Sequence, residues 1–134
     1  MRSWGENMAK EILHTDSAPQ AIGPYSQGVR AGGFVFLSGQ IPLDPLTGQV
    51  TGANIVAQTE QVMKNIEAVL SASGLGFADV VKTTIFLIDL ADFSAVNEVY
   101  GRRFQQDPPA RSTVEVQGLP RGVRVEIEVV ACCR

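Results

Sequence analysis

Arg111 is the residue whose surroundings most directly suggest chemistry. It follows Pro108 and Pro109 and opens residues 111–116 (RSTVEV), which read as a β-strand. A guanidinium is always charged and presents a rigid fork of donors, so a planar carboxylate is its natural small-molecule partner. The alternative is a surface arginine that ends a loop. The stretch therefore predicts a carboxylate site that other residues must complete.

Two further side chains can be placed by local spacing. Phe93 and Asn97 lie one helical turn apart, so they can face the same cleft, with core packing and surface capping as the alternatives. Tyr25 follows Gly23 and Pro24, a rigid turn that would hold a phenol at the edge of a cleft. Packing of its ring is the alternative. These spacings favour substrate contacts without assigning roles.

Polar residues also occur at the ends and on the faces of predicted strands. Ser38 and Gly39 end a strand, where the simplest interpretation is an exit into a loop. Glu126 alternates with apolar neighbours, which is typical of a solvated strand carboxylate. Neither position specifies chemistry by itself.

Six short blocks follow one another along the chain: residues 21–27 (AIGPYSQ), 36–42 (FLSGQIP), 81–84 (VKTT), 92–97 (DFSAVN), 108–116 (PPARSTVEV) and 125–128 (VEIE). Together they resemble the RidA (YjgF-like) family of reactive enamine/imine deaminases, from about residue 10 to residue 131. Six blocks in order make chance an unsatisfactory explanation.

The resemblance implies a cofactor-independent enzyme that hydrolyses reactive 2-enamino and 2-imino acids, such as 2-aminoacrylate and 2-iminopropionate. The products are 2-oxo acids and ammonia, and the reaction protects pyridoxal-phosphate enzymes from damage. Two alternatives stay open. One is a regulatory trimer that binds 2-oxo acids without turnover, and the other is an endoribonuclease or translation inhibitor.

The resemblance also implies roles for residues. The catalytic residues are expected to be Arg111, Glu126 and Tyr25, and the substrate-binding residues Arg111, Ser38, Gly39, Thr113, Phe93 and Asn97. Thr113 departs from the family, because many members carry cysteine at this position. The implied assembly is a homotrimer with sites at subunit interfaces, where we expect Arg111 and Glu126 of one subunit to work with Phe93 and Asn97 of its neighbour.

Composition argues against several other classes. The net charge of −3 and the lack of a basic stripe argue against nucleic acid. One histidine, His14, and two adjacent cysteines, Cys132 and Cys133, do not form a metal-ligand set, so no metal is expected. No phosphate-binding motif occurs, and no cofactor is expected. No apolar run approaches membrane-spanning length, and the cysteines suit a reducing cytoplasm.

These residues must be positioned by the elements around them. Apolar spacing from Asn54, a plausible N-cap, to Gly74 predicts one amphipathic helix, and residues 92–104 predict a second. Strands are expected at residues 11–13, 27–30, 34–38, 80–88, from 111 and at 123–131, the last with alternate residues facing the helices. The order β-β-β-α-β-α-β-β predicts an α+β sandwich. The resemblance makes it chorismate-mutase-like, with a mixed, mostly antiparallel six-stranded sheet and two helices on one face.

At 134 residues the chain supports one domain with a substantial core. We expect that domain to span residues 9–134. Residues 1–8 are expected to be an N-terminal extension that is disordered or was added during cloning, because Met8 would serve equally well as a start.

Overall fold

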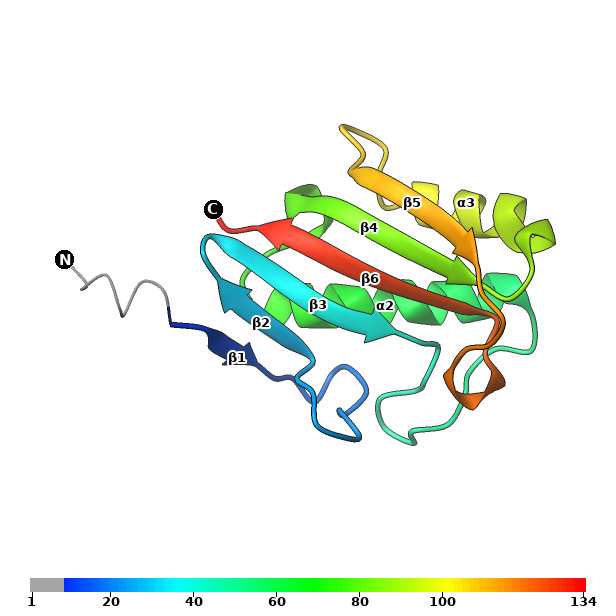
Figure 1. The fold of residues 1–134 in the computed structure, drawn as a ribbon, viewed down its shortest axis with the longest axis horizontal. Coiled ribbons are helices and arrows are strands. Elements are labelled where there is room, and N and C mark those ends of the chain that lie inside the picture. Colours follow the sequence, from blue (N-terminus) through cyan, green and yellow to red (C-terminus); the bar gives the residue numbers. More distant parts are fainter. Residues whose placement is uncertain (1–8) are drawn as a thin grey trace.

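The computed structural model describes residues 9–134, so the expectation for residues 1–8 lies outside it. The strands are β1 (Glu11–Leu13), β2 (Gly28–Ala31), β3 (Phe34–Gln40), β4 (Val80–Leu87), β5 (Ala110–Glu115) and β6 (Val125–Cys132). The α-helices are α2 (Ile55–Ala72) and α3 (Phe93–Gly101), and 3₁₀ turns lie at Phe77–Asp79, Leu90–Asp92 and Pro120–Gly122. This chain order confirms the predicted order of strands and helices (Figure 1).

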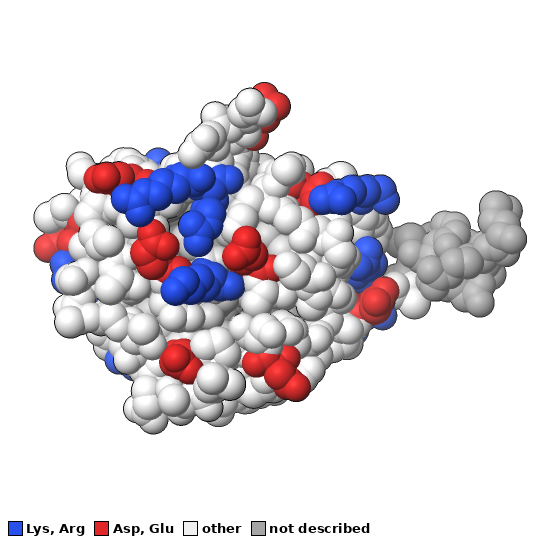
Figure 2. Space-filling view, turned by 180° about the vertical axis from the view of Figure 1, so that it is seen from behind, with Lys and Arg blue, Asp and Glu red and all other residues white. Residues whose placement is uncertain are grey.

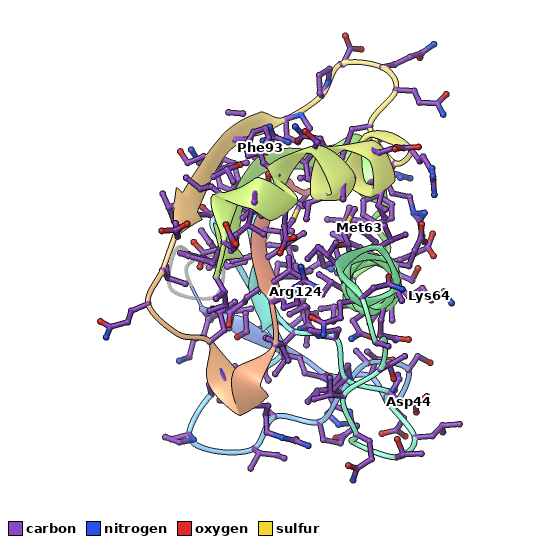
Figure 3. All side chains as sticks on the ribbon, turned by 90° about the vertical axis from the view of Figure 1, so that its right-hand side faces the viewer. Asp44, Met63, Lys64, Phe93 and Arg124 are labelled. Atoms are coloured by element: carbon purple, nitrogen blue, oxygen red, sulfur yellow. The ribbon has the colours of Figure 1, made fainter. Side chains whose placement is uncertain are left out.

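The six strands form one mixed sheet in the order β1-β2-β3-β6-β4-β5. Only the pair β4 and β5 is parallel, and α3 supplies the crossover that a parallel connection needs. Both helices cover the same face of the sheet, as the views in Figures 1 and 3 show. The fold therefore has two layers and leaves the other face of the sheet open.

Local sequence explains where the main elements begin and end. The side chain of Asn54 accepts a hydrogen bond from the Ala57 N–H at 2.9 Å and so caps the start of α2. Gly74, with φ of 78°, follows the end of this helix. Gly32 and Gly33 both have positive φ and close the hairpin between β2 and β3. These three features agree with the sequence-based expectations.

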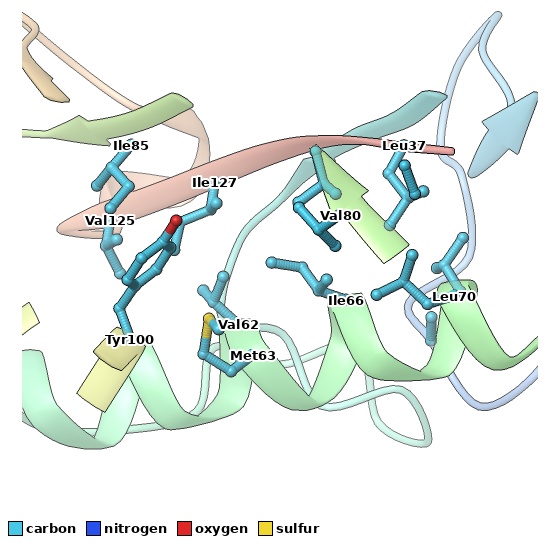
Figure 4. Close-up of a cluster of buried hydrophobic side chains, with 14 of the residues drawn as sticks. Leu37, Val62, Met63, Ile66, Leu70, Val80, Ile85, Tyr100, Val125 and Ile127 are labelled. Atoms are coloured by element: carbon cyan, nitrogen blue, oxygen red, sulfur yellow. The ribbon is translucent and has the colours of Figure 1, made fainter. Parts of the chain in front are cut away.

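The core lies between the sheet and the two helices, and Figure 4 shows part of it in close-up. The predicted alternation of β6 is confirmed, because Val125, Ile127, Val129 and Ala131 are all buried. The helix contributes the fully buried Val62, Met63, Ile66, Val69 and Leu70. Each such side chain stabilises the fold by roughly 1.5–3 kcal/mol relative to exposure. The sheet that carries the polar residues therefore rests on a closely packed layer.

The second helix is shorter than predicted. It ends at Gly101 rather than at Phe104, and a 3₁₀ turn at Leu90–Asp92 precedes it. Glycine is a poor helix residue. The ring of Phe104 then turns back to pack against Tyr100 and Phe77, with ring centroids 4.6 and 5.4 Å away, respectively. This return leads the chain towards the edge strand β5.

An ion pair joins the start of β6 to the start of α3. Arg124 donates two hydrogen bonds to Asp92, from Nε to Oδ2 at 3.2 Å and from Nη2 to Oδ1 at 2.6 Å. Asp92 directly precedes Phe93, and Figure 3 labels both Phe93 and Arg124. The side chain of Gln58 on α2 also accepts from the Arg124 backbone N–H at 2.9 Å. Three elements that border the polar residues are thus held together.

On the helix-covered side, basic and acidic side chains lie next to one another (Figure 2). Arg102, for example, is 3.0 Å from Glu60 and 3.6 Å from Glu98. Neither α-helix of residues 9–134 combines the length and apolarity needed to cross a membrane.

Candidate functional site

Arg111 lies in β5 and faces the first turns of α3. Its Nη1 donates a hydrogen bond to Oδ1 of Asn97 at 2.7 Å. The guanidinium carbon lies 5.4 Å from the centre of the Phe93 ring and 5.1 Å from that of Tyr100. An amide and two aromatic faces therefore hold the guanidinium in a defined place. The predicted residues Arg111, Phe93 and Asn97 are brought together by the fold.

Tyr100 belongs to this group, although no functional role was predicted for it. Its hydroxyl is 2.7 Å from that of Thr83 on β4, a buried contact that fixes the ring. Burial raises the pKa of the Tyr100 hydroxyl and outweighs the opposing effects of the Thr83 hydrogen bond and the Arg111 charge. The phenol therefore stays neutral. Phe93 and Tyr100 are seven positions apart and so lie on one stripe of a helix, but core packing produces the same spacing.

The charge of Arg111 is not neutralised within the described chain. No carboxylate of residues 9–134 lies within 4.0 Å of its guanidinium nitrogens. It lines a cavity of about 500 Å³ together with Asn97, Tyr100, Pro108 and Pro109. We call this space the Arg111 cavity. The guanidinium N–H groups that do not bond to Asn97 can bind a carboxylate there.

A second cavity contains the other predicted catalytic residues. Tyr25, Ser38, Gly39 and Glu126 line a space of about 460 Å³, which we call the Glu126 cavity. Tyr25 is 53% exposed, and its hydroxyl accepts a hydrogen bond from the Ile22 N–H at 3.4 Å. Its ring is therefore not buried in the core.

The close approach of Glu126 to β3 depends on Gly39. A Cβ atom at position 39 would lie 2.8 Å from Cδ of Glu126 and overlap its carboxylate. The pairing of β3 with β6 is irregular here, between Leu37 and Gln40. Ser38 uses its hydroxyl to donate to the Ser26 carbonyl at 2.5 Å. Ser38 thus fixes the neighbouring loop, while Gly39 makes room for the acid.

Buried hydrogen bonds hold the loop that forms the rim of this cavity. Gln27 is almost fully buried and donates to the carbonyls of Thr15 and Pro19 at 3.0 and 2.8 Å. Its Oε1 accepts from the Thr15 N–H at 2.7 Å. A single amide therefore positions the segment from Thr15 to Pro19 beside Tyr25.

Glu126 has the electrostatic character of an acid–base group. Partial burial raises the pKa of its carboxyl, and the negative charge of Glu128 on the same strand face raises it further. The group therefore keeps its proton to a higher pH than a solvated glutamate does. Such a carboxyl is better matched to proton transfer near neutral pH.

The side chains of Arg111 and Glu126 point to opposite faces of the sheet. Arg111 pairs with Thr83 and Glu126 pairs with Phe86, and these two residues of β4 are separated by an odd number of positions. Thr83 points towards α3, so Arg111 does too, whereas Glu126 points to the open face. The strands β5 and β6 are also two strand spacings apart, about 9.6 Å. One small molecule cannot contact both residues of the same chain.

This geometry corrects the expected division of the site. Asn97 and Phe93 were expected from the neighbouring subunit, but both contact Arg111 of their own chain. It is Glu126 that lies apart. The local pattern could not show this, because the face on which Arg111 lies follows from the parallel pairing of β5 with β4.

Thr113 is not placed at either cavity. It pairs with Ile85 and so points to the same side as Arg111, but it lines neither space. Its Oγ1 is buried and makes no hydrogen bond within residues 9–134. A role in substrate binding stays a prediction. Among these residues no group of three or more His, Cys, Asp or Glu side chains is arranged to hold a metal ion.

Comparison with known proteins identifies relatives over almost the whole chain. A family described as Endoribonuclease L-PSP matches residues 15–133. Protein DfrA of Myxococcus xanthus is 60% identical over 92% of this chain and 96% of its own length. Reactive Intermediate Deaminase A, chloroplastic, of Arabidopsis thaliana is 49% identical over 93% of this chain and 67% of its own length. The crystal structure of E. coli TdcF with bound serine is 44% identical, with a TM-score of 0.88, over 92% of this chain and 99% of that one.

Proposed function

The chain belongs to the Endoribonuclease L-PSP family, which includes the RidA (YjgF-like) proteins, and we propose that it hydrolyses reactive 2-enamino and 2-imino acids. The substrates would include 2-aminoacrylate and its tautomer 2-iminopropionate. Water adds to the C=N bond, and the products are a 2-oxo acid and ammonia. The reaction would protect pyridoxal-phosphate enzymes, which release such intermediates, in the cytoplasm.

The observation that carries the proposal is the state of Arg111. Its guanidinium is held by Asn97 and two aromatic rings, yet no carboxylate of the described chain neutralises it. A preorganised cation of this kind favours a small carboxylate ligand. The serine bound to TdcF, a relative of the same fold, supports a ligand that carries an α-carboxylate.

Glu126 would act on the water and the nitrogen. Its raised pKa suits a group that takes a proton from water as this adds to the imine carbon and then gives one to the departing nitrogen. Such proton transfer contributes about 10²- to 10⁴-fold to a rate. Tyr25 would border the substrate from the rim of the same cavity.

A complete site then requires a second copy of the chain. Arg111 and Glu126 of one chain face opposite sides of the sheet, so the substrate would bind between the Arg111 cavity of one subunit and the Glu126 cavity of another. The open face carries large apolar side chains in contact with solvent, including Phe34, Phe36 and Val114 at 41–46% exposure. Such a surface favours burial against other copies. We propose a homotrimer with three shared sites.

The test is hydrolysis of 2-iminopropionate generated in situ, followed through its semicarbazone in the presence and absence of the protein. Faster loss of the imine with this protein supports the proposal. Unchanged loss contradicts it. In that case, tight binding of 2-oxo acids would indicate a regulatory protein, and cleavage of single-stranded RNA would indicate the endoribonuclease that gives the family its description.

A further inference from the structure

Arg121 is a second arginine whose charge is not neutralised near the candidate site. It lines the Glu126 cavity, and its Nη1 donates a hydrogen bond to the Gly48 carbonyl at 3.2 Å. No carboxylate of residues 9–134 lies within 4.0 Å of its guanidinium nitrogens. The bond to Gly48 uses one of five donors. The remaining donors are available to an anion at the cavity.

The backbone of Arg121 is in an unfavourable conformation. Its φ of 61° and ψ of 16° are left-handed, and in residues 9–134 only Asp107 shares a positive φ among residues other than glycine. Gly122 directly follows with φ of 69°. Glycine at position 121 would adopt this conformation without a steric penalty. A long charged side chain at a strained position beside a cavity points to a role for that side chain.

The wall of the Glu126 cavity, which both Glu126 and Arg121 line, is largely apolar. Ile22, Ile41 and Leu43 line the same space as these two charged residues. An aliphatic chain fits such a wall, and an anionic group at its end could pair with the guanidinium. Neither feature is needed to hydrolyse the three-carbon 2-iminopropionate.

We propose that Arg121 binds a second carboxylate, at the far end of the substrate, and so directs the enzyme towards 2-imino dicarboxylic acids with four or five carbons. In this arrangement, which rests on the proposed function and its shared site, the α-carboxylate pairs with Arg111 of one subunit. The imine carbon lies at Glu126 of the other, and the side-chain carboxylate reaches Arg121 beside it. Arg121 is a specificity residue and takes no part in the proton transfers.

The first experiment measures binding without turnover, so that it does not depend on the hydrolytic activity. Calorimetry compares 2-oxoglutarate with 2-oxopentanoate, which has the same five-carbon chain but lacks the second carboxylate. We expect wild type to bind 2-oxoglutarate at least about tenfold more tightly, as one charge-assisted contact provides. In Arg121→Ala the ratio of the two affinities should fall to near one, whereas Arg121→Lys should keep part of the preference.

Two further variants test whether the preference for 2-oxoglutarate comes from the Arg121 side chain itself, rather than from the net charge of the protein or the structure of the loop. Arg102→Ala removes the same charge from a side chain that lines neither cavity and pairs with Glu60, and its affinity ratio should equal that of wild type. Arg121→Gly relieves the backbone strain, so it should unfold at an equal or higher temperature while losing the preference. An affinity ratio near one in wild type, or a preference that survives in Arg121→Gly, would overturn the proposal.

The second experiment measures turnover of 2-iminoglutarate against 2-iminopropionate. A ratio of kcat/KM that favours the dicarboxylate in wild type and collapses in Arg121→Ala supports the proposal, and equal ratios in the two proteins contradict it. If neither imine is hydrolysed, the proposed function fails, while the calorimetry still decides the role of Arg121. Native mass spectrometry of each variant shows whether Arg121 acts instead by holding subunits together, which would also overturn the proposal.

Discussion

Arg111 contacts Asn97, Phe93 and Tyr100 and pairs with no carboxylate of residues 9–134, so it offers the most direct test at the level of single residues. Arg111→Ala should abolish imine hydrolysis without unfolding the protein, because the side chain is exposed and packs outside the core. Truncating one partner of a hydrogen-bonded charge pair costs roughly 2–5 kcal/mol, at least about 30-fold in kcat/KM. Arg111→Lys should also be impaired, since a point charge cannot form two parallel bonds.

The matched control for this experiment is Arg102→Ala, which removes an equal charge from the end of α3. Its guanidinium pairs with Glu60 and Glu98 and lines neither cavity. Circular dichroism checks the fold of each variant. Wild-type kinetics in a folded Arg111→Ala protein would exclude this residue from the site.

Replacing Glu126 by glutamine should lower the activity of the protein but raise its stability at pH 7. Because its pKa is raised on folding, the folded state favours the protonated form, and the ionised form destabilises the fold above the ordinary value of 4.5. Glu126→Gln should therefore unfold at a higher urea concentration at pH 7. The difference should shrink as the pH falls towards 4.5. Activity should drop by about 10²- to 10⁴-fold.

Urea titrations at pH 4.5 and pH 7 measure this change, with Glu67→Gln on the exposed side of α2 as control. The control should show no comparable gain at pH 7. A Glu126→Gln variant that is less stable than wild type at pH 7 would show that the carboxylate is stabilised by a favourable partner, contrary to the raised pKa.

At the level of elements, the irregular pairing of β3 with β6 places the acid. Gly39→Ala should push the Glu126 carboxylate away, since a Cβ at position 39 would overlap its Cδ. The obstacle is the end of a side chain that can rotate, so stability should change by less than about 1 kcal/mol. Misplacement of a catalytic group by 1 Å can cost about 10²-fold in rate. We expect folded, trimeric and nearly inactive protein.

Gly76→Ala is the matched control, because a Cβ at this position meets no atom within 4 Å and the backbone φ is −140°. Kinetics and thermal unfolding of both variants are compared. Equal activity in the two proteins would mean that displacing Glu126 does not impair catalysis. The close approach of Glu126 to Gly39 would then have no functional role.

Features set by near neighbours in the chain could be predicted from the sequence. The cap at Asn54, the glycine after α2 and the alternation of β6 each depend on a few adjacent residues, and all three are confirmed. The side of the sheet on which Arg111 lies depends instead on pairing between β4 and β5, which are joined through a whole helix. No local pattern encodes that pairing, so the sequence predicted neither the contact of Arg111 with Asn97 of its own chain nor its contact with Tyr100.

At the scale of the whole molecule, the sheet separates the two halves of the proposed site. One face presents the Arg111 cavity beside α3, and the other presents Glu126 among exposed apolar side chains. A monomer holds both halves but cannot bring them to one substrate. Activity should therefore depend on assembly. Subunits with mutations in different halves should complement each other in mixed trimers, whereas subunits with mutations in the same half should not.

Mixed trimers test this division. Arg111→Ala subunits lack one half of the site and Glu126→Gln subunits lack the other, so each protein alone should be nearly inactive. The two variants are mixed in equal amounts, unfolded and refolded together. A site is then intact when its Arg111 half comes from a Glu126→Gln subunit and its Glu126 half comes from an Arg111→Ala subunit. Random assembly should then restore about a quarter of wild-type activity, since each half is intact with a probability of about one half.

The decisive control pairs Arg111→Ala with Asn97→Ala. These residues contact each other within one chain, at 2.7 Å, so every Arg111 half is damaged whichever subunits combine. Mixing should therefore give no more than the average of the two variants, whereas the first pair should exceed its average. Native mass spectrometry verifies that mixed trimers form in both samples. If the Arg111 and Asn97 variants complement each other while the Arg111 and Glu126 variants do not, Arg111 and Glu126 act from the same subunit and the shared site assigned to opposite faces of the sheet is wrong.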